Sequence, residues 1–233
     1  MILAKNIRFL RSKLGYSDND FAALFDRPIE WLNHIETGKS EPSIPELAML
    51  AKELKVSMDD LVLQDLAHLI SFKSESIEMV VLDVDGVMTD GGMYYTEVGD
   101  QIKKFNTKDG RAIIRLKQIG YKTAFLSSGL AEKLINARAE VLGVDKVYVG
   151  RSNKIDILKK WCSELGLELH QIAYIGDDIN DLDVIKKVGL SACPADAIID
   201  VKREVQIILH KNGGEGCVRE FVEDYLFEQH IQL

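Results

Sequence analysis

Apolar residues recur at helical spacing through the first part of the chain. The first such stretch ends at Gly15 and carries Leu3, Ile7, Leu10 and Leu14. The stretches that follow begin at residues that favour the start of a helix, namely Ser17, Pro28, Ser43 and Ser57. The last stretch is expected to end near Ile70. This pattern predicts a small all-α domain of five short helices over residues 1–70.

The pattern changes after a polar segment without periodicity, which we interpret as a linker at residues 71–77. Short apolar runs then alternate with helical patterns. The runs are 79–82, 122–126, 146–149 and 172–175, and the helical patterns between them are 111–119, 131–142 and 155–165. This alternation predicts a second domain of the α/β class at residues 78–233, with a Rossmann-like parallel sheet covered on both faces.

One segment of the second domain departs from this alternation. Residues 91–96 and 101–105 have the composition of two strands, and they flank a four-residue loop at 97–100. Two strands joined by so short a loop pair in antiparallel fashion. We therefore expect a β-hairpin inserted into the α/β domain.

The composition is that of an ordinary globular protein, with 46% hydrophobic and 28% charged residues. The formal net charge of −8 offers no overall basic excess for binding nucleic acid or an acidic membrane. The 3 cysteines contain no C-x-x-C pair, and no apolar run approaches the ~18 residues that a membrane helix needs. We expect a soluble cytoplasmic protein without membrane contact, disulfide framework or zinc site.

Acidic residues follow two of the predicted strands. Asp83 and Asp85 come directly after the run 79–82, and Asp177, Asp178 and Asp181 come after the run 172–175. The carboxyl ends of parallel strands meet at one edge of a sheet, so these carboxylates would share a crevice. Oxygen ligands without histidine or cysteine favour Mg²⁺. Each cluster alone could equally be a solvated turn or a helix cap, and their joint occurrence favours a metal site.

Two further elements fit the same sheet edge. Ser127, Ser128 and Gly129 end a strand, where hydroxyl and N–H groups at a helix start could bind an anion. Lys154 opens the helix after the run 146–149, where a lysine opposes the helix dipole. The alternatives are simple capping for the serines and an ordinary surface position for the lysine. The misfit of Lys154 with the dipole favours a functional role.

The order of these elements resembles the four motifs of the haloacid dehalogenase superfamily, over residues 78–226. The motifs are Asp83-x-Asp85, a serine at a strand end, a lysine, and Gly-Asp-Asp-x-x-Asp. Three stretches narrow the resemblance: DVDGVMTDG at 83–91, KFNTKDG at 104–110 and GGEGCVREF at 213–221. They are similar to the 3-deoxy-D-manno-octulosonate 8-phosphate phosphatase group. That group includes relatives acting on nine-carbon ulosonate 9-phosphates and a domain appended to some acylneuraminate cytidylyltransferases.

The resemblance implies a phosphoric monoester hydrolase that needs Mg²⁺. Its substrate would be a 2-keto-3-deoxy sugar acid phosphate, either an octulosonate 8-phosphate or a nonulosonate 9-phosphate. Asp83 would attack phosphorus and form an aspartyl-phosphate, and Asp85 would serve as general acid and then as general base. Mg²⁺ would be held by Asp83, the backbone carbonyl of Asp85, and Asp177.

The same resemblance assigns supporting roles to other residues. Ser127 and Lys154 would hold the transferring phosphoryl oxygens. Asp178 and Asp181 would orient waters and Lys154. The usual Thr-Gly-Arg or Thr-Gly-Glu of the group is replaced by Ser127-Ser128-Gly129. Which of the two serines provides the functional hydroxyl therefore stays open, and so does the sugar.

The spacing of the motifs leaves no room for a cap domain, and the resembling group forms tetramers through its hairpin. We therefore expect a homotetramer in which the glycine-rich tail of one subunit closes a neighbour's site. Substrate-binding residues would be Ser128, Lys108, Gly213, Gly214, Gly216 and Arg219. The arginine suits a carboxylate because its fork binds one with two hydrogen bonds. The alternatives are an ordinary loop for the glycines and an exposed helix face for the arginine.

The first domain resembles the Cro/CI-type helix-turn-helix fold over residues 3–66. By that register Ile29, Glu30, Trp31 and Asn33 would face the major groove of DNA. Only Asn33 is a favoured base reader, and Glu30 would meet phosphates badly. Residues 1–66 hold 8 lysines and arginines against 11 aspartates and glutamates, a net charge of −3, which is a poor footprint for DNA. Trp31 could instead belong to the core or anchor a protein contact.

These observations leave an alternative to the enzyme. The chain could be a DNA-binding regulator or an assembly protein. Its phosphatase-like domain would then sense a sugar phosphate or dock a cytidylyltransferase. The complete set of acidic residues favours the enzyme, because a sensor would not need Asp85.

Overall fold

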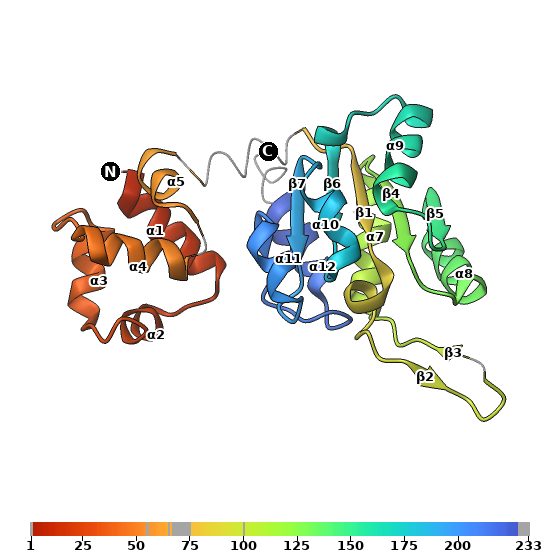
Figure 1. The fold of residues 1–233 in the computed structure, drawn as a ribbon, viewed down its shortest axis with the longest axis horizontal. Coiled ribbons are helices and arrows are strands. Elements are labelled where there is room, and N and C mark those ends of the chain that lie inside the picture. The colour runs from red at the N-terminus through yellow and green to blue at the C-terminus, as the bar shows by residue number, and fades with distance from the viewer. Residues whose placement is uncertain (1, 55, 65, 67–75, 100, 228–233) are drawn as a thin grey trace. The chain divides into compact units, whose positions relative to one another are not determined.

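The computed structural model describes residues 2–54, 56–64, 66, 76–99 and 101–227. The chain divides into two compact units, Met1–Phe72 and Lys73–Leu233, which are described separately below (Figure 1). The boundary falls inside the segment predicted as a linker. Most of that segment, residues 71–75, lies outside the described residues, as do residues 67–70 of the predicted fifth helix.

The described part of the first unit is helical, as predicted. Its helices are α1 (Ile2–Lys13), α2 (Asp18–Ala23), α3 (Ile29–Glu36), α4 (Ile44–Glu53) and α5 (Met58–Leu63). Ser17, Ser43 and Ser57 each cap a helix by accepting a backbone N–H bond in its first turn. The helices enclose a core whose buried members include Ile7, Phe21, Leu32, Leu50 and Leu61.

The fifth helix is shorter than predicted. It ends at Leu63, and Gln64 adopts an extended conformation. Asn6 is fully buried and donates from Nδ2 to the carbonyls of Leu61 and Gln64, at 2.9 and 2.6 Å. These bonds satisfy carbonyl groups at the end of the helix, which have no partner within it. The apolar pattern alone did not reveal this stop, because the stop depends on a side chain from α1.

The strands of the second unit form a parallel sheet in the order β5-β4-β1-β6-β7-β8. The four predicted strands are β1 (Met79–Leu82), β4 (Lys122–Ser127), β5 (Lys146–Val149) and β6 (Ile172–Ile175). Strands β7 (Leu190–Cys193) and β8 (Ile207–Ile208) were not predicted. β1 pairs with β4 on one side and with β6 on the other, in register from Met79 to Leu82. The α/β class with a parallel sheet is confirmed.

Helices cover both faces of this sheet (Figure 1). Helices α9 (Lys154–Leu165), α10 (Leu182–Ile185) and α11 (Ile199–Glu204) share one buried cluster with side chains from β1 and β6. Helix α7 (Thr107–Gln118) contacts β4, α8 (Glu132–Leu142) and α12 (Cys217–Phe221). This placement of the helices on opposite faces agrees with right-handed crossover connections. Helices α7 and α8 connect strands in one direction along the sheet, and α9 connects strands in the opposite direction.

The predicted hairpin is present and extends away from the sheet (Figure 1). Its strands are shorter than expected, β2 (Tyr94–Tyr95) and β3 (Gln101–Ile102), with Tyr94 opposite Ile102 and Tyr95 opposite Gln101. The loop after β2 accordingly begins at Thr96, one residue earlier than predicted. At the base of the hairpin, Thr89 and Phe105 form an isolated antiparallel bridge. Among the described residues, no helix is long and apolar enough to cross a membrane.

Candidate active site

Three strand ends and one helix start meet at one edge of the parallel sheet. Strand β1 lies between β4 and β6, so the residues that follow these strands are neighbours. Asp83 follows β1, Asp177 follows β6 after one glycine, and Ser127 is the last residue of β4. Lys154 is the first residue of α9, which comes after β5. The structure thus brings together residues that the motifs only suggested.

Lys154 lies at the centre of this cluster. Its side chain is 2% exposed, and its Nζ lies 2.9 Å from Asp83 Oδ1 and 2.6 Å from Asp181 Oδ1. Burial lowers the pKa of the Lys154 ammonium, but the two carboxylates outweigh this effect and leave the pKa above its ordinary value. The side chain is therefore a cation at the centre of the acidic cluster.

Asp181 is a supporting carboxylate, because both of its oxygens are occupied. Oδ1 accepts from Lys154 and from the hydroxyl of Tyr174 at 2.5 Å. Oδ2 accepts the backbone N–H groups of Asp177 at 2.9 Å and Asp178 at 3.2 Å. The side chain is fully buried. Tyr174 itself is buried in β6 and was not identified from the sequence, where it stands in an apolar run.

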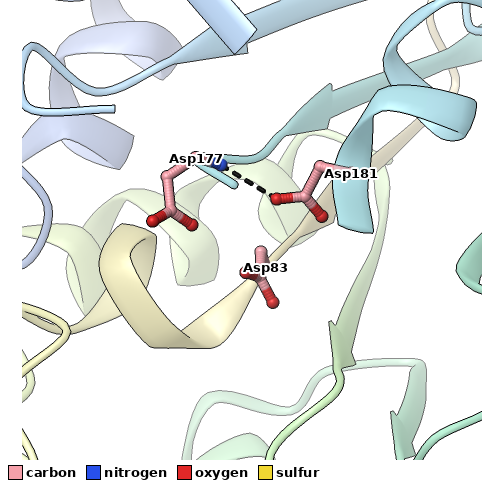
Figure 2. A group of neighbouring side chains, drawn as sticks. All are labelled: Asp83, Asp177 and Asp181. Atoms are coloured by element: carbon pink, nitrogen blue, oxygen red, sulfur yellow. Dashed lines mark hydrogen bonds between the residues drawn. The ribbon is translucent and has the colours of Figure 1, made fainter. Parts of the chain in front are cut away.

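The carboxylates of Asp83, Asp177 and Asp181 converge (Figure 2), and one oxygen from each lies within 4.8 Å of the others. Asp177 Oδ1 is buried and has no hydrogen-bond partner. Burial, followed by the repulsion of Asp181, raises the pKa of Asp83 to about 7. Burial, followed by the repulsion of Asp83, raises the pKa of Asp177 to about 8. Both shifts show that the protein leaves negative charge here without sufficient compensation.

This donor set fits a divalent cation. One lysine ammonium faces the buried carboxylates of Asp83 and Asp181, with the partly buried Asp177 beside them, and its buried oxygen without a partner is costly. All side-chain donors of the cluster that could bind a metal are hard oxygens, which suit Mg²⁺ better than softer metals. Because Asp181 is fully engaged, Asp83 and Asp177 are the members with oxygens available to a metal ion.

Asp85 lies at the open side of the site. It is part of the turn η1 (Val84–Met88), in which Gly86 has a φ of 88°. A side chain at Gly86 would collide with the Asp177 carboxylate, so the close approach of the turn to β6 requires glycine there. The Asp85 carboxylate forms an ion pair with Lys103, a residue just after β3 that the sequence analysis did not identify.

The two serines after β4 have different partners. The Ser127 hydroxyl is buried, donates to Asp85 Oδ2 at 3.4 Å and accepts the N–H of Gly129 at 3.0 Å. The Ser128 hydroxyl accepts from Asn180 Nδ2 at 3.1 Å, across the loop that follows β6. Of the two, Ser127 therefore faces the candidate catalytic residue.

The glycine-rich segment packs beneath the turn of its own chain. Side chains at Gly213 and Gly214 would collide with the backbone of Gly86 and of Asp90. The N–H of Gly214 donates to the carbonyl of Val87 at 2.9 Å. These glycines thus support the turn that carries Asp85. Their predicted contact with substrate in a neighbouring subunit stays a prediction.

The other predicted residues occupy peripheral positions. Lys108 is exposed in the first turn of α7, and Gly216 precedes α12 with a φ of 105°. The Arg219 guanidinium is paired with Glu223. Asp178 is exposed and accepts the N–H of Ile179 at 2.7 Å, which is the capping role weighed as an alternative.

A cavity of about 280 Å³ lies between the hairpin and the loop after β4. Asp85, Gly129 and Leu130 line one side, and the hairpin contributes Tyr95 and Lys103 among others. A side chain at Gly129 would press on the Asp85 carboxylate, so the glycine keeps this entrance open. The cavity therefore offers space for part of a ligand next to Asp85.

In the helical unit, the residues predicted to face DNA are divided between surface and core. Glu30 and Asn33 are exposed on α3, and Ile29 is half-buried. Trp31 is half-buried against the Phe25 ring at 5.5 Å, and its Nε1 donates to Glu46 Oε1 at 3.1 Å. These contacts assign Trp31 to the edge of the core, one of the alternatives considered from the sequence.

Comparisons with known proteins agree with both units. A family model of the haloacid dehalogenase-like hydrolases matches residues 130–221, and a helix-turn-helix family model matches residues 7–61. The chain is 36% identical, over 157 residues, to the 3-deoxy-D-manno-octulosonate 8-phosphate phosphatase of Salmonella typhi. The match covers 67% of this chain and 83% of that protein.

Solved structures show the same similarity. The 3-deoxy-D-manno-octulosonate 8-phosphate phosphatase of Yersinia pestis superposes with a TM-score of 0.67 at 34% identity, covering 70% of this chain and 87% of that one. The enzyme of the same name from Moraxella catarrhalis gives a TM-score of 0.67 at 32% identity, covering 69% and 92%. That structure is a complex with a magnesium ion, a phosphate ion and a KDO molecule.

Proposed function

This chain belongs to the haloacid dehalogenase superfamily and is a phosphoric monoester hydrolase, and from that premise we propose that it hydrolyses the phosphate ester of a 2-keto-3-deoxy sugar acid. The observation that carries the proposal is the buried Asp83–Lys154–Asp181 cluster beside Asp177, whose Oδ1 lacks a partner. Such a cluster combines a nucleophile, a fixed cation and a place for a metal ion at one sheet edge.

Mg²⁺ would be held by Asp83, the backbone carbonyl of Asp85, and Asp177, and would screen the charge between a carboxylate nucleophile and the phosphate. The Lys154 ammonium, fixed between Asp83 and Asp181, would neutralise a phosphoryl oxygen. The Ser127 hydroxyl would donate a hydrogen bond to a second phosphoryl oxygen. Asp181 would act by fixing Lys154 rather than by touching the substrate.

The reaction would proceed in two displacements. The Asp83 carboxylate attacks phosphorus, the bond from phosphorus to the sugar oxygen breaks, and Asp85 donates a proton to that oxygen. Water then gives a proton to Asp85 and attacks the aspartyl-phosphate, which releases inorganic phosphate and restores Asp83. The half-exposed position of Asp85 at the cavity, with the buried Asp83 behind it, supports this division of roles.

The sugar acid would have eight or nine carbons. The relatives named above are octulosonate 8-phosphate phosphatases. The stretches 91–95 and 213–221 lean toward the branch acting on nonulosonate 9-phosphates. The slot that carries an arginine or glutamate in the group holds Gly129 here, next to a cavity of about 280 Å³. We expect this difference to affect the choice of sugar rather than the chemistry.

Phosphate release from a panel of eight- and nine-carbon ulosonate phosphates, with other sugar phosphates for comparison, tests the proposal. We expect Mg²⁺-dependent release from an ulosonate phosphate and its loss in Asp83→Asn. Release from none of them, or equal release by Asp83→Asn, would overturn the proposal. Chelation with EDTA should stop the reaction and added Mg²⁺ should restore it.

We propose that the protein is a homotetramer in the cytoplasm, and the hairpin supports the assembly. Met93, Val98 and Ile102 are large apolar side chains exposed on or beside it, and exposed apolar patches mark interaction sites. Light scattering should give about four times the chain mass. Replacing Ile102 and Val98 with aspartate should shift the protein to smaller species, and a wild-type monomer would contradict the assembly.

The helix-turn-helix match favours a second activity of the helical unit, binding of DNA. Against it stand the exposed Glu30 on α3 and the acidic balance of residues 1–66. Retention of the full chain on immobilised DNA at increasing salt concentration tests whether the helical unit binds DNA. A DNA-binding protein is retained at low salt and released steeply as the salt concentration rises. Absence of retention would favour the other alternative, an assembly module that docks a partner such as a cytidylyltransferase, which co-purification would detect.

A further inference from the structure

Two consecutive lysines follow strand β3, and they have different surroundings. The Lys103 side chain is 10% exposed, and its ammonium forms an ion pair with Asp85. The Lys104 side chain is 64% exposed, and its Nζ lies 3.6 Å from Asp90 Oδ2. Successive side chains of an extended segment point to opposite sides, so the hairpin directs Lys103 inward and Lys104 outward. Burying an ammonium is costly, and the reaction outlined above assigns no role to Lys103.

Lys103 lies where the leaving group of the reaction must be. The cavity of about 280 Å³ is lined by both Asp85 and Lys103. Because Asp85 protonates the ester oxygen, the first carbons attached to that oxygen occupy the adjoining part of the cavity. Among the described residues that line the cavity, Lys103 is the cation, whereas Lys154 is occupied by Asp83 and Asp181 behind the turn.

The chemistry of the sugar acid decides what Lys103 would meet. In an ulosonate 8- or 9-phosphate the ester oxygen is on the terminal carbon, and the next carbon carries a hydroxyl. The carboxylate is at the opposite end of the carbon chain. A lysine ammonium has three donors and no acceptor, and the pair with Asp85 engages one of them. A hydroxyl oxygen beside Asp85 can accept another.

We propose that Lys103 is a specificity-determining residue that binds the hydroxyl on the carbon next to the phosphate ester. This inference rests on the proposed function and names the part of the substrate that this lysine recognises. By holding Asp85 and the hydroxyl at once, Lys103 aligns the ester oxygen with the acid. The site then favours phosphate esters of polyhydroxylated chains over esters that lack the neighbouring hydroxyl.

The test is a cycle of two enzymes and two substrates. The substrates are the ulosonate phosphate that the wild type hydrolyses best and its analogue without the hydroxyl next to the ester. The wild type should hydrolyse the analogue with a kcat/KM about 10- to 100-fold lower, the usual range for a lost hydrogen bond to a charged group. Lys103→Met should lose more on the full substrate than on the analogue, by a factor of similar size, because the loss of the Asp85 ion pair affects both substrates alike. Lys103→Arg should recover part of the loss.

Lys104→Met is the matched control, because its exposed side chain faces away from Asp85. It should leave both substrates unchanged. If Lys103→Met loses the same factor on both substrates, the lysine serves the fold or Asp85 alone and the inference is overturned. The inference also fails if the wild type does not distinguish the two substrates. Absence of wild-type activity on every ulosonate phosphate would instead overturn the proposed function, and the inference with it.

Discussion

Each unit of this protein contains a buried ionic cluster, and the two clusters are balanced differently. In the helical unit, Arg11 Nε lies 2.7 Å from Glu36 Oε1, and the Arg11 Nη2 donates to Glu36 Oε2 at 3.2 Å. Arg11 Nη1 also reaches Asp18 Oδ1 at 2.7 Å. Arg11 and Glu36 thus form a bidentate ion pair with good geometry. In the described part of this unit, no buried side-chain nitrogen or oxygen lacks a partner.

The cluster of the α/β unit has an excess of acid. Lys154 faces Asp83 and Asp181, and Asp177 adds a third carboxylate with a buried oxygen left unpaired. Its surroundings raise the pKa of Asp83 and of Asp177 and so disfavour their charged forms, whereas the hydrogen bond to Glu36 raises the pKa of Arg11 and so favours its charged form. A satisfied cluster stabilises a fold. A cluster that is short of positive charge is prepared for a ligand that supplies it.

The largest effect is expected when the cation of the α/β cluster is removed. Lys154→Met leaves buried carboxylates without their ammonium and takes away the charge that would face the phosphate. We expect loss of at least about 3 kcal/mol in unfolding free energy, as for other broken buried pairs, together with loss of phosphate release. Thermal melting followed by circular dichroism and a phosphate assay measure the two. A stable, active variant would refute the role given to Lys154.

The matched change in the helical unit is Arg11→Met. It leaves Glu36 buried with only the weaker Arg8 contact at 3.6 Å, so we expect a destabilisation of similar size, about 3 kcal/mol. Phosphate release at a temperature where the chain stays folded should be unchanged, because the cluster lies in the unit without the acidic motifs. Loss of activity without loss of structure would show that the helical unit contributes to catalysis.

The sequence predicts best the buried strands of the fold and the site residues that directly follow them. The apolar runs of β1, β4, β5 and β6 were visible, and the carboxyl ends of such strands gather side chains at one edge. Strand β7 was missed because it reads Leu-Ser-Ala-Cys, with Ser191 buried and paired to Gln206. Strand β8 has two residues, too few for any pattern.

The remaining site residues depend on contacts that spacing does not encode. Tyr174 sits in an apolar run, and only the fold shows its hydroxyl on Asp181. Lys103 becomes relevant because the hairpin brings it back to Asp85. Spacing left Ser127 and Ser128 equivalent, and the hydrogen bond from Ser127 to Asp85 separates them. These are tertiary facts, and no single stretch of sequence carries them.

The smallest expected effect is the response of stability to Mg²⁺, which is measured together with the dependence of stability on pH. Burial and like charge raise the pKa of Asp83 to about 7 and that of Asp177 to about 8, from ordinary values of 3.8. Between about pH 4 and pH 8 the folded chain therefore holds more protons than the unfolded chain. Without metal, the stability of the α/β unit should fall as pH rises through this range.

Mg²⁺ should cancel this loss at the alkaline end, because it binds the ionised carboxylates and stabilises the fold, by about 2.7 kcal/mol at a hundredfold excess over its Kd. Asp177→Asn should flatten the pH dependence of stability and abolish the response to Mg²⁺.

Asp109 also contributes to the pH dependence of stability, because burial raises its pKa to about 6. This contribution lies in the acid part of the range, and Mg²⁺ should not change it. The Arg11–Glu36 pair should contribute none of the Mg²⁺ response, so Arg11→Met should keep it in full. Melting curves at pH 5 and pH 8, with and without Mg²⁺, measure these responses: an equal response in wild type and Asp177→Asn would mean that the excess acid of this cluster is not a metal site.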